Sequence, residues 1–479
     1  MKPVMKYAVN WLMFLLLSGM AVTSQAVSVA SNGVGGVLIY PYYTVNNDLN
    51  FLYSVVNTSS HTKAVKIRFL EGDIGLDVLT FNVYLGAYDV WTGALVPTTS
   101  TIDEHLGEAS VLHVSGDTSC APFLNKGGQQ FLPFVIDTDL DPDNRDMSRS
   151  REGYLEVYEM ANLVTPQAVQ MIDHSNRGVP TNCAGLENVW QAGSWVLGPD
   201  EDPSGDLLGS ASLVNVNEGL AFHYDALALK NFGLTAENHT EPSAALPDLD
   251  SAVPESTVLL PDGQLIQAEW THGFQAVSAV LTQAQVGNEF NLETVLNANT
   301  EWVMTSPTRK FHTNSGDLAL LPPFLAPWQG NDLTSCDRYR VEMWDRETRY
   351  EDGIPNGGVL PPPGGIYPKL CQAITVMEFI YNAPTHFDRT AVLGSRNHMN
   401  RYAAIPGGDW LPSGAGRVHF LDAEPAVPIS GAGLQGLPVT GFAVMQFTNA
   451  GAAEGLLAQY GSLFKHLGQQ TLAATETTP

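Results

Sequence analysis

Apolar and polar residues alternate along several short stretches of the chain. Residues 65–69 read Val-Lys-Ile-Arg-Phe, so the odd positions are apolar and the even positions, Lys66 and Arg68, are charged. Successive side chains of a β-strand point to opposite faces, so this period of two predicts a strand with one face on a core and the other in water. The same period over residues 79–85 predicts a second strand, and the polar residues 57–63 are long enough for a hairpin connection.

Other short apolar stretches also predict strands, and turn residues separate them. They lie at residues 51–56, 154–158, 213–216, 220–229, 302–304, 339–344, 374–379, 418–421 and 439–447. The best helix candidate, residues 276–285, is short. The chain holds 44 Gly and 30 Pro, which favours many turns over long helices. We therefore predict an all-β protein of two immunoglobulin-like β-sandwich domains, with long loops and few short helices.

Residues 236–255 interrupt this pattern with polar residues and prolines that follow no period. We interpret the segment as a linker or exposed loop between a first domain at residues 27–235 and a second domain at residues 256–479. The charges differ across it, because residues 27–255 hold 9 basic and 30 acidic residues, whereas residues 256–479 hold 12 and 20. The negative charge therefore belongs mainly to the first domain.

The first 26 residues have the pattern of a signal peptide. Lys2 and Lys6 precede an apolar run, and Ser24 and Ala26 are small residues at the positions that precede a cleavage site. A run of about 12 apolar residues spans only ~18 Å as a helix, which is too short for a hydrocarbon core of ~30 Å. We predict cleavage after Ala26, no transmembrane segment in the remaining chain, and a location in the periplasm, on the outer surface or outside the cell.

The chain contains four cysteines, which all follow the predicted cleavage site: Cys120, Cys183, Cys336 and Cys371. An even number in an oxidising compartment predicts two disulfides, for which three pairings are possible. We favour Cys120–Cys183 and Cys336–Cys371, because each bond then closes a loop within one predicted domain. A zinc site is not expected, since the chain has no Cys-x-x-Cys and no histidine close to a cysteine.

Charged residues make up 15% of the chain, and 50 Asp and Glu against 23 Lys and Arg give a net charge of −27. Binding to a phosphate backbone requires clustered Lys and Arg, so the composition argues against nucleic acid as a partner. The sequence also lacks Gly-x-Ser-x-Gly, His-Glu-x-x-His and the P-loop pattern, which mark common hydrolases, metalloproteases and NTPases. We therefore assign no catalytic residue.

Acidic residues recur through one short stretch, at Asp137, Asp139, Asp141, Asp143 and Asp146. Carboxylates spaced in this way can converge on one Ca²⁺, which takes six to eight oxygen ligands. The stretch departs from an EF-hand, because Pro142 occupies the position of the turn glycine and Ser148 that of the bidentate glutamate. Two interpretations remain, namely a looser calcium site completed by backbone carbonyls and a solvated acidic loop.

Trp190 and Trp195 flank a glycine-containing loop beside the acidic residues 200–202. A tryptophan face next to carboxylates can stack on a sugar ring and hydrogen-bond its hydroxyl groups. The alternative is that both rings fill a core, as large aromatic side chains commonly do. These two tryptophans are the candidate ligand-binding residues of the chain.

Two parts of the sequence resemble a known family. Residues 54–58 and 64–72, followed by Asp-Val-Trp-Thr-Gly at residues 89–93, resemble the opening of a family of exported proteobacterial proteins of unknown function. Residues 301–311, which read Glu-Trp-Val-Met-Thr-Ser-Pro-Thr-Arg-Lys-Phe, resemble a second block of that family. The resemblance implies export and a β-rich surface protein with immunoglobulin-like modules, and it brings no active site.

These patterns together predict a non-catalytic secreted or cell-surface protein with a structural or binding role. Calcium is its candidate cofactor, and surface proteins or glycans are its candidate partners. The alternative is an extracellular protein that binds or hydrolyses glycans through Trp190, Trp195 and nearby acids. The sequence specifies neither a ligand nor an oligomeric state.

Overall fold

The computed structural model describes residues 26–133, 145–174, 178–313, 320–324, 326–328, 335–351, 368–381, 386–403, 411–420, 423–453 and 456–473. Within these ranges the chain is built mainly from β-strands, which confirms the predicted all-β class. The α-helices of the described part are short: α1 (Pro166–Ile172), α2 (Cys183–Gln191), α3 (Gly273–Leu281) and α4 (Arg309–Thr313). Single 3-10 turns lie at η2 (Met147–Arg151), η3 (Ala236–Asn238), η4 (Leu249–Ser251) and η5 (Thr294–Leu296).

Two six-stranded antiparallel sheets take their strands from the first half of the chain. The first sheet has the order β1 (Ser28–Val29), β12 (Leu227–Lys230), β2 (Val37–Thr44), β9 (Glu152–Leu163), β4 (Thr62–Glu71) and β5 (Asp77–Leu85). The second sheet has the order β11 (Leu220–Asp225), β10 (Leu207–Asn215), β3 (Asn50–Asn57), β6 (Val90–Thr99), β7 (Ala109–Val114) and β8 (Gln129–Gln130).

Three further sheets take their strands from the second half of the chain. The third sheet joins β13 (Glu255–Leu259), β14 (Leu265–Glu269) and β24 (Ser430–Gly431). The fourth sheet has the order β19 (Tyr350–Glu351), β18 (Asp337–Asp345), β23 (Ser413–Phe420), β16 (Gln285–Asn291) and β29 (Leu467–Gln469), with β20 (Lys369–Leu370) paired to β18. The fifth sheet has the order β22 (His398–Tyr402), β21 (Ile374–Ile380), β17 (Asn299–Thr305), β27 (Thr440–Ala453) and β28 (Leu456–Lys465). Two small pairs complete the described strands: β15 (Thr282–Gln283) with β26 (Leu437–Pro438), and β25 (Leu434–Gln435) with β30 (Thr471–Leu472).

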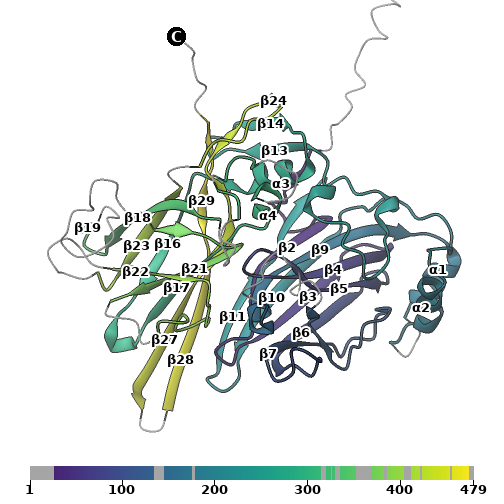
Figure 1. The fold of residues 1–479 in the computed structure, drawn as a ribbon, viewed down its shortest axis with the longest axis horizontal. Helices are drawn as coiled ribbons and strands as arrows, with labels where there is room; N and C mark the ends of the chain where they lie inside the picture. The colour runs from purple at the N-terminus through teal and green to yellow at the C-terminus, as the bar shows by residue number, and fades with distance from the viewer. Residues whose placement is uncertain are drawn as a thin grey trace, which may run out of the picture.

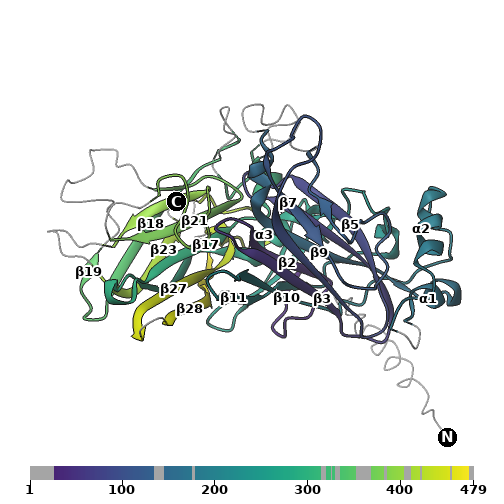
Figure 2. The same cartoon turned by 90° about the horizontal axis from the view of Figure 1, so that it is seen from below.

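The predicted pair of immunoglobulin-like sandwich domains is wrong. The described strands form five sheets of three or more strands, and these are arranged as a five-bladed β-propeller. Figures 1 and 2 show the first and second sheets on one side of the molecule and the fourth and fifth sheets on the other. Alternation within a strand specifies which of its faces is buried, but it does not specify which sheet lies against that face.

The two halves of the chain share hydrophobic cores. One cluster of buried side chains contains Phe51 and Phe69 from the first half together with Val303, Val376 and Phe442 from the second half. A second cluster joins residues of the first sheet to α3 and the third sheet. The burial of apolar side chains therefore stabilises the arrangement of the sheets relative to one another as well as each sheet alone.

The charged face of β4 is buried, although alternation predicted that it would face water. Every residue of β4 is buried, and so is every residue of its neighbour β9. Residues 236–255, which were expected to form a linker or exposed loop, lie over this face. The carbonyl oxygen of Glu241 accepts a hydrogen bond from Lys66 Nζ at 2.7 Å, and that of Pro247 accepts one from Arg68 Nη1 at 3.1 Å. The period thus located the strand correctly, but a segment remote in sequence covers its polar side.

Residues 390–397 connect the fifth sheet to the first-half strands. On one side, the backbone N–H of Leu393 donates to Glu301 Oε2 at 3.0 Å and that of Ala391 donates to Glu378 Oε1 at 3.0 Å. On the other side, Asn47 Nδ2 donates to the carbonyl oxygens of residues 390–392 at 3.0 to 3.3 Å. Both edges of this segment are therefore held by polar side chains, buried at Glu301 and Glu378 and half-buried at Asn47.

Glu301 and Glu378 face each other at paired positions on β17 and β21. Burial, and then the charge of the facing Glu378, raises the pKa of Glu301 to about 8. Burial also raises the pKa of Glu378. Two carboxylates this close cannot both ionise without cost, so the pair retains a proton at a pH where exposed glutamates have lost theirs.

We predict that Glu301→Gln weakens the dependence of stability on pH. Because the pKa of Glu301 is raised on folding, its contribution is present below about pH 4.5 and is lost as the pH rises towards about 8. Glutamine cannot ionise, so the free energy of unfolding of the variant should decline less between pH 5 and 8, by on the order of a few kcal/mol. Urea unfolding at several pH values measures this. The exposed Glu347→Gln is the matched control, and an unchanged pH slope in the Glu301 variant would contradict the prediction.

Candidate functional site

Two short helices and a disulfide form a small module beside the first sheet (Figure 1). Helix α1 begins with Pro166, whose fixed φ suits a first helical turn. Helix α2 begins after Asn182, whose side-chain oxygen accepts a hydrogen bond from the Gly185 N–H at 2.9 Å. This side chain satisfies a backbone donor that the helix itself leaves free.

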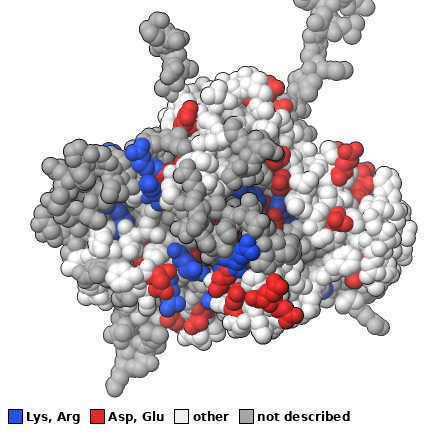
Figure 3. Space-filling view, viewed as in Figure 1, with Lys and Arg blue, Asp and Glu red and all other residues white. Residues whose placement is uncertain are grey.

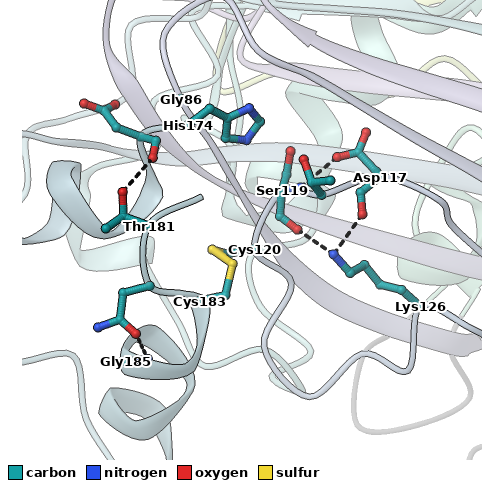
Figure 4. The surroundings of a disulfide bond; sticks show 12 residues. Gly86, Asp117, Ser119, Cys120, Lys126, His174, Thr181, Cys183 and Gly185 are labelled. Carbon is teal, nitrogen blue, oxygen red and sulfur yellow. Dashed lines mark hydrogen bonds between the residues drawn. A yellow bond between two sulfur atoms is a disulfide. The ribbon is translucent and has the colours of Figure 1, made fainter. Parts of the chain in front are cut away.

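The two disulfides have the favoured pairing, Cys120–Cys183 and Cys336–Cys371. Figure 4 shows the first bond, which attaches the start of α2 to the loop after β7. Beside it, Lys126 Nζ donates to the carbonyl oxygens of Asp117 and Ser119 at 2.8 and 3.1 Å. Because Cys120 and Cys183 lie 63 positions apart, the chain-entropy model assigns this crosslink about 4 kcal/mol of stability.

Trp190 and Trp195 lie next to each other in this module and pack against further aromatic rings. Their ring centroids are 5.7 Å apart. The ring of Trp195 stacks on Tyr84 with an interplanar angle of 10° and approaches His239 to 4.4 Å between centroids. Trp190 Nε1 donates a hydrogen bond to the Tyr84 hydroxyl at 2.7 Å. The indole faces are therefore in contact with other side chains of the protein.

A series of hydrogen bonds links Asp200, His239 and Tyr84. His239 Nδ1 lies 2.8 Å from Asp200 Oδ2, and His239 Nε2 lies 2.9 Å from the Tyr84 hydroxyl. A carboxylate can only accept, so Nδ1 carries the proton and Nε2 accepts from the tyrosine. Burial lowers the pKa of His239 and raises the pKa of Tyr84. Both changes favour the neutral side chains that this hydrogen-bond pattern requires.

Asp200, His239 and Tyr84 follow one another in the order of a proton relay, in which an acid, a histidine and a hydroxyl group are hydrogen-bonded in series. Their burial, however, prevents contact with a substrate. Tyr84 is 0% exposed and His239 is 8% exposed. The same holds for Ser278 Oγ, which lies 2.7 Å from His312 Nε2 in the interior, where burial lowers the pKa of His312 to about 3. A catalytic hydroxyl must reach the atom that it attacks, and neither hydroxyl can do so in this structure.

The acidic stretch lies largely outside the described residues. Asp137, Asp139, Asp141 and Asp143 fall in the gap between residues 133 and 145. Asp146 is described, and its Oδ1 accepts a hydrogen bond from the Ser148 N–H at 2.7 Å at the start of η2. No group of three or more potential metal ligands is found among the described residues. The calcium site therefore stays a prediction.

Grooves border β28, and no pattern in the sequence predicted them. Four cavities, with volumes of about 490, 610, 640 and 680 Å³, share this strand as a wall. Each is lined by at least one residue among Ser462, Leu463, Phe464 and Lys465. Residues 456–465 are rich in apolar residues, so a strand could have been predicted there. The grooves themselves depend on neighbours that are distant in sequence.

Acidic side chains gather over the side of the molecule that holds the first and second sheets, on the face that Figure 3 shows. The basic side chains on this face lie mostly towards the centre and the opposite side. This distribution agrees with the excess of acidic residues counted in the first half of the sequence.

Comparison of the chain with known protein families, curated proteins and solved structures finds no match. In the part of the chain that the structure describes, the α-helices have five to nine residues, and none of them is long and apolar enough to cross a membrane.

We predict that Trp195 contributes to stability through its ring rather than its N–H. Trp195→Ala removes the contacts with Tyr84 and His239 and should lower the free energy of unfolding by about 2 kcal/mol, less than for a fully buried tryptophan. Trp195→Phe retains a ring and should cost less than about 1.5 kcal/mol. Urea unfolding of both variants measures the difference, and equal losses would contradict the assignment.

Proposed function

We propose that the chain is an exported, non-catalytic protein with a binding or structural role, and that it binds along β28. The strongest support for this proposal is that two pairs of reactive side chains and the concave surfaces lie in different parts of the molecule. The Tyr84–His239 and Ser278–His312 pairs are buried, whereas the grooves along β28 are lined largely by apolar, glycine and amide residues. Small-molecule sites are concave and mostly apolar, with a few polar groups that orient the ligand.

Export is supported by two independent features. The N-terminal 26 residues have the signal peptide pattern, and all four cysteines of the chain are joined in disulfides. Disulfides persist in oxidising compartments and are rare in the cytosol. The proposed location is therefore the periplasm, the outer surface or the extracellular medium.

Export and oxidation can be tested together on the full chain expressed in a bacterium. We expect the protein in the cell envelope or medium, with a mature N-terminus at Val27 and no thiol that reacts under denaturing conditions. The double variant Cys120→Ser, Cys183→Ser is the control for the thiol assay and should also show none. Four reactive thiols, or an unprocessed chain in the cytosol, would overturn this part of the proposal.

Calcium binding by the five aspartates between Asp137 and Asp146 belongs to the same proposal. Carboxylate oxygens are ligands that Ca²⁺ prefers, and a ligand that binds only the folded state raises stability with the logarithm of its concentration once that exceeds Kd.

We predict that EDTA lowers the melting temperature of the purified protein and that added Ca²⁺ restores it. The double variant Asp139→Asn, Asp141→Asn should abolish the response, because it removes two charged ligands. Asp262→Asn, at an exposed position outside the stretch, is the matched control. A melting temperature that neither EDTA nor Ca²⁺ changes would leave the stretch as a solvated acidic loop.

One observation favours glycan binding as a second candidate function. Trp195 Nε1 and Asp200 Oδ1 are buried without a hydrogen-bond partner, and a sugar hydroxyl could serve a donor and an acceptor at once. The packing of Trp195 against Tyr84 and His239 opposes it, because it reduces the indole area that is open to a sugar ring. Glycan binding that is lost in Trp195→Phe but retained in Val295→Ser, an exposed control, would support this alternative.

A further inference from the structure

An apolar cleft lies where the first sheet, the third sheet and the C-terminal strands meet. Its volume is about 490 Å³, within the range of roughly 300–1,000 Å³ that is usual for small-molecule sites. Its floor consists of buried apolar side chains from α3, β16, β17 and the residue before β27: Val280, Leu281, Val286, Met304 and Val439. We call this the apolar cleft.

The rim of the apolar cleft is also apolar, but it is exposed. Val29 on β1, Leu259 at the end of β13 and Leu467 at the start of β29 are 41%, 64% and 79% exposed. Isolated exposed apolar side chains are common on protein surfaces. Three of them around a concave apolar floor form a contiguous patch, and such patches mark binding sites.

Lys465 is the only residue with a formal charge among those that line the apolar cleft. It is exposed, and none of the ion pairs between described residues involves it. Its neighbour His466 is neutral, because Nε2 donates to the Val303 carbonyl oxygen at 3.0 Å while Nδ1 accepts from Asn288 Nδ2 at 3.1 Å, so only one ring nitrogen carries a proton. Burial lowers the pKa of His466 to about 4, in agreement with this assignment. Among the described residues that line it, the cleft therefore offers a single positive charge and no carboxylate.

The cavity of about 680 Å³ continues from the apolar cleft past Lys465. The two cavities share Val29, Leu227, Thr440, Gly441 and Lys465 as lining residues. The lysine thus lies where the two meet, at the boundary of the apolar floor.

We propose that the apolar cleft binds a single-chain fatty acid, with the alkyl chain on the floor and the carboxylate beside Lys465 Nζ. Burial of methylene groups against the floor supplies most of the affinity, at roughly 25 cal/mol per Å² of apolar surface. The opposite charges of the carboxylate and the ammonium orient the ligand. This inference deepens the proposed binding role and rests on it.

Other ligand classes fit these residues less well. An uncharged hydrocarbon does not use Lys465, and a sugar would use the amide side chains of Gln283 and Gln470 but not the five apolar side chains of the floor. An alkyl amine would place a positive charge next to the lysine, which is unfavourable. A fatty acid matches both the apolar surface and the sign of the charge.

The experiment titrates the purified full chain with cis-parinaric acid, a fluorescent fatty acid, and then displaces it with competitors. We expect saturable binding, displacement by oleate, weaker displacement by oleyl alcohol and the weakest by oleylamine. Lys465→Met should weaken probe binding about fivefold, the effect of an exposed ion pair. Lys369→Met, at an exposed lysine on β20 outside the cleft, is the matched control and should bind as the wild type does.

A second variant tests the apolar rim without disturbing the core. Leu467→Ser changes a side chain that is 79% exposed and should leave the melting temperature unchanged while weakening probe binding several-fold. Val295→Ser, 84% exposed and remote from the cleft, is its control.

Several outcomes would overturn the inference: absence of saturable binding, equal affinity in Lys465→Met and wild type, or equal displacement by oleylamine and oleate. Displacement by a two-chain phosphatidylcholine dispersion as effectively as by oleate would overturn the single-chain assignment. A processed, fully oxidised protein that does not bind the probe would overturn only this inference, because processing and thiol content test the proposed function separately.

Discussion

The burial of charged side chains on both faces of the first sheet constrains the rest of the structure. Lys63 Nζ lies 2.6 Å from Glu159 Oε1, and both side chains are 0% exposed. Arg68 binds Asp77 at 2.8 Å and is itself almost fully buried. An unpaired buried charge costs several kcal/mol, so these residues require partners inside the protein. Residues 236–255 cover the face of β4 that carries Arg68, because a carbonyl oxygen of this segment, together with the carboxylate of Asp77, satisfies this buried cation.

The need to pair buried polar groups also joins the two halves of the chain. The backbone of residues 390–397 lies between buried carboxylates on the fifth sheet and the side chain of Asn47 from the first half. Buried N–H and carbonyl groups must be paired, and here the partners come from both halves. Polar contacts therefore fix the register of the junction, while the shared hydrophobic clusters supply the buried apolar area.

The distribution of reactive and apolar groups connects the fold to the proposed role. The histidine pairs at Tyr84 and Ser278 lie in the interior, where they satisfy buried polar atoms, whereas the pair of Ser212 with His223 lies at the surface. The concave surfaces lie instead along β28, the last strand of the fifth sheet, whose neighbours come from both halves of the chain. This arrangement is the observation on which the proposed binding role rests.

In the cluster around Trp190 and Trp195, closeness in the sequence predicted some of the side chains that lie together. Trp190, Trp195 and Asp200 lie within eleven positions of one another and do come together. Tyr84 and His239 complete the cluster from positions more than 35 residues away, and no local pattern marks them. They pack against the ring of Trp195, one of the two candidate residues for binding a sugar.

The sequence by itself determined the all-β class, the position of twelve of the thirty described strands and the number of disulfides. Each of these follows from a local property, namely the two-residue period, the turn residues and the even count of cysteines in an exported chain. Only the tertiary structure decided that the charged side of β4 is covered, that the sheets form five blades and that clefts border β28. These features depend on which segments distant in sequence come into contact. The two-residue period specifies which side chains share a face of a strand, but it does not specify which segment packs against that face.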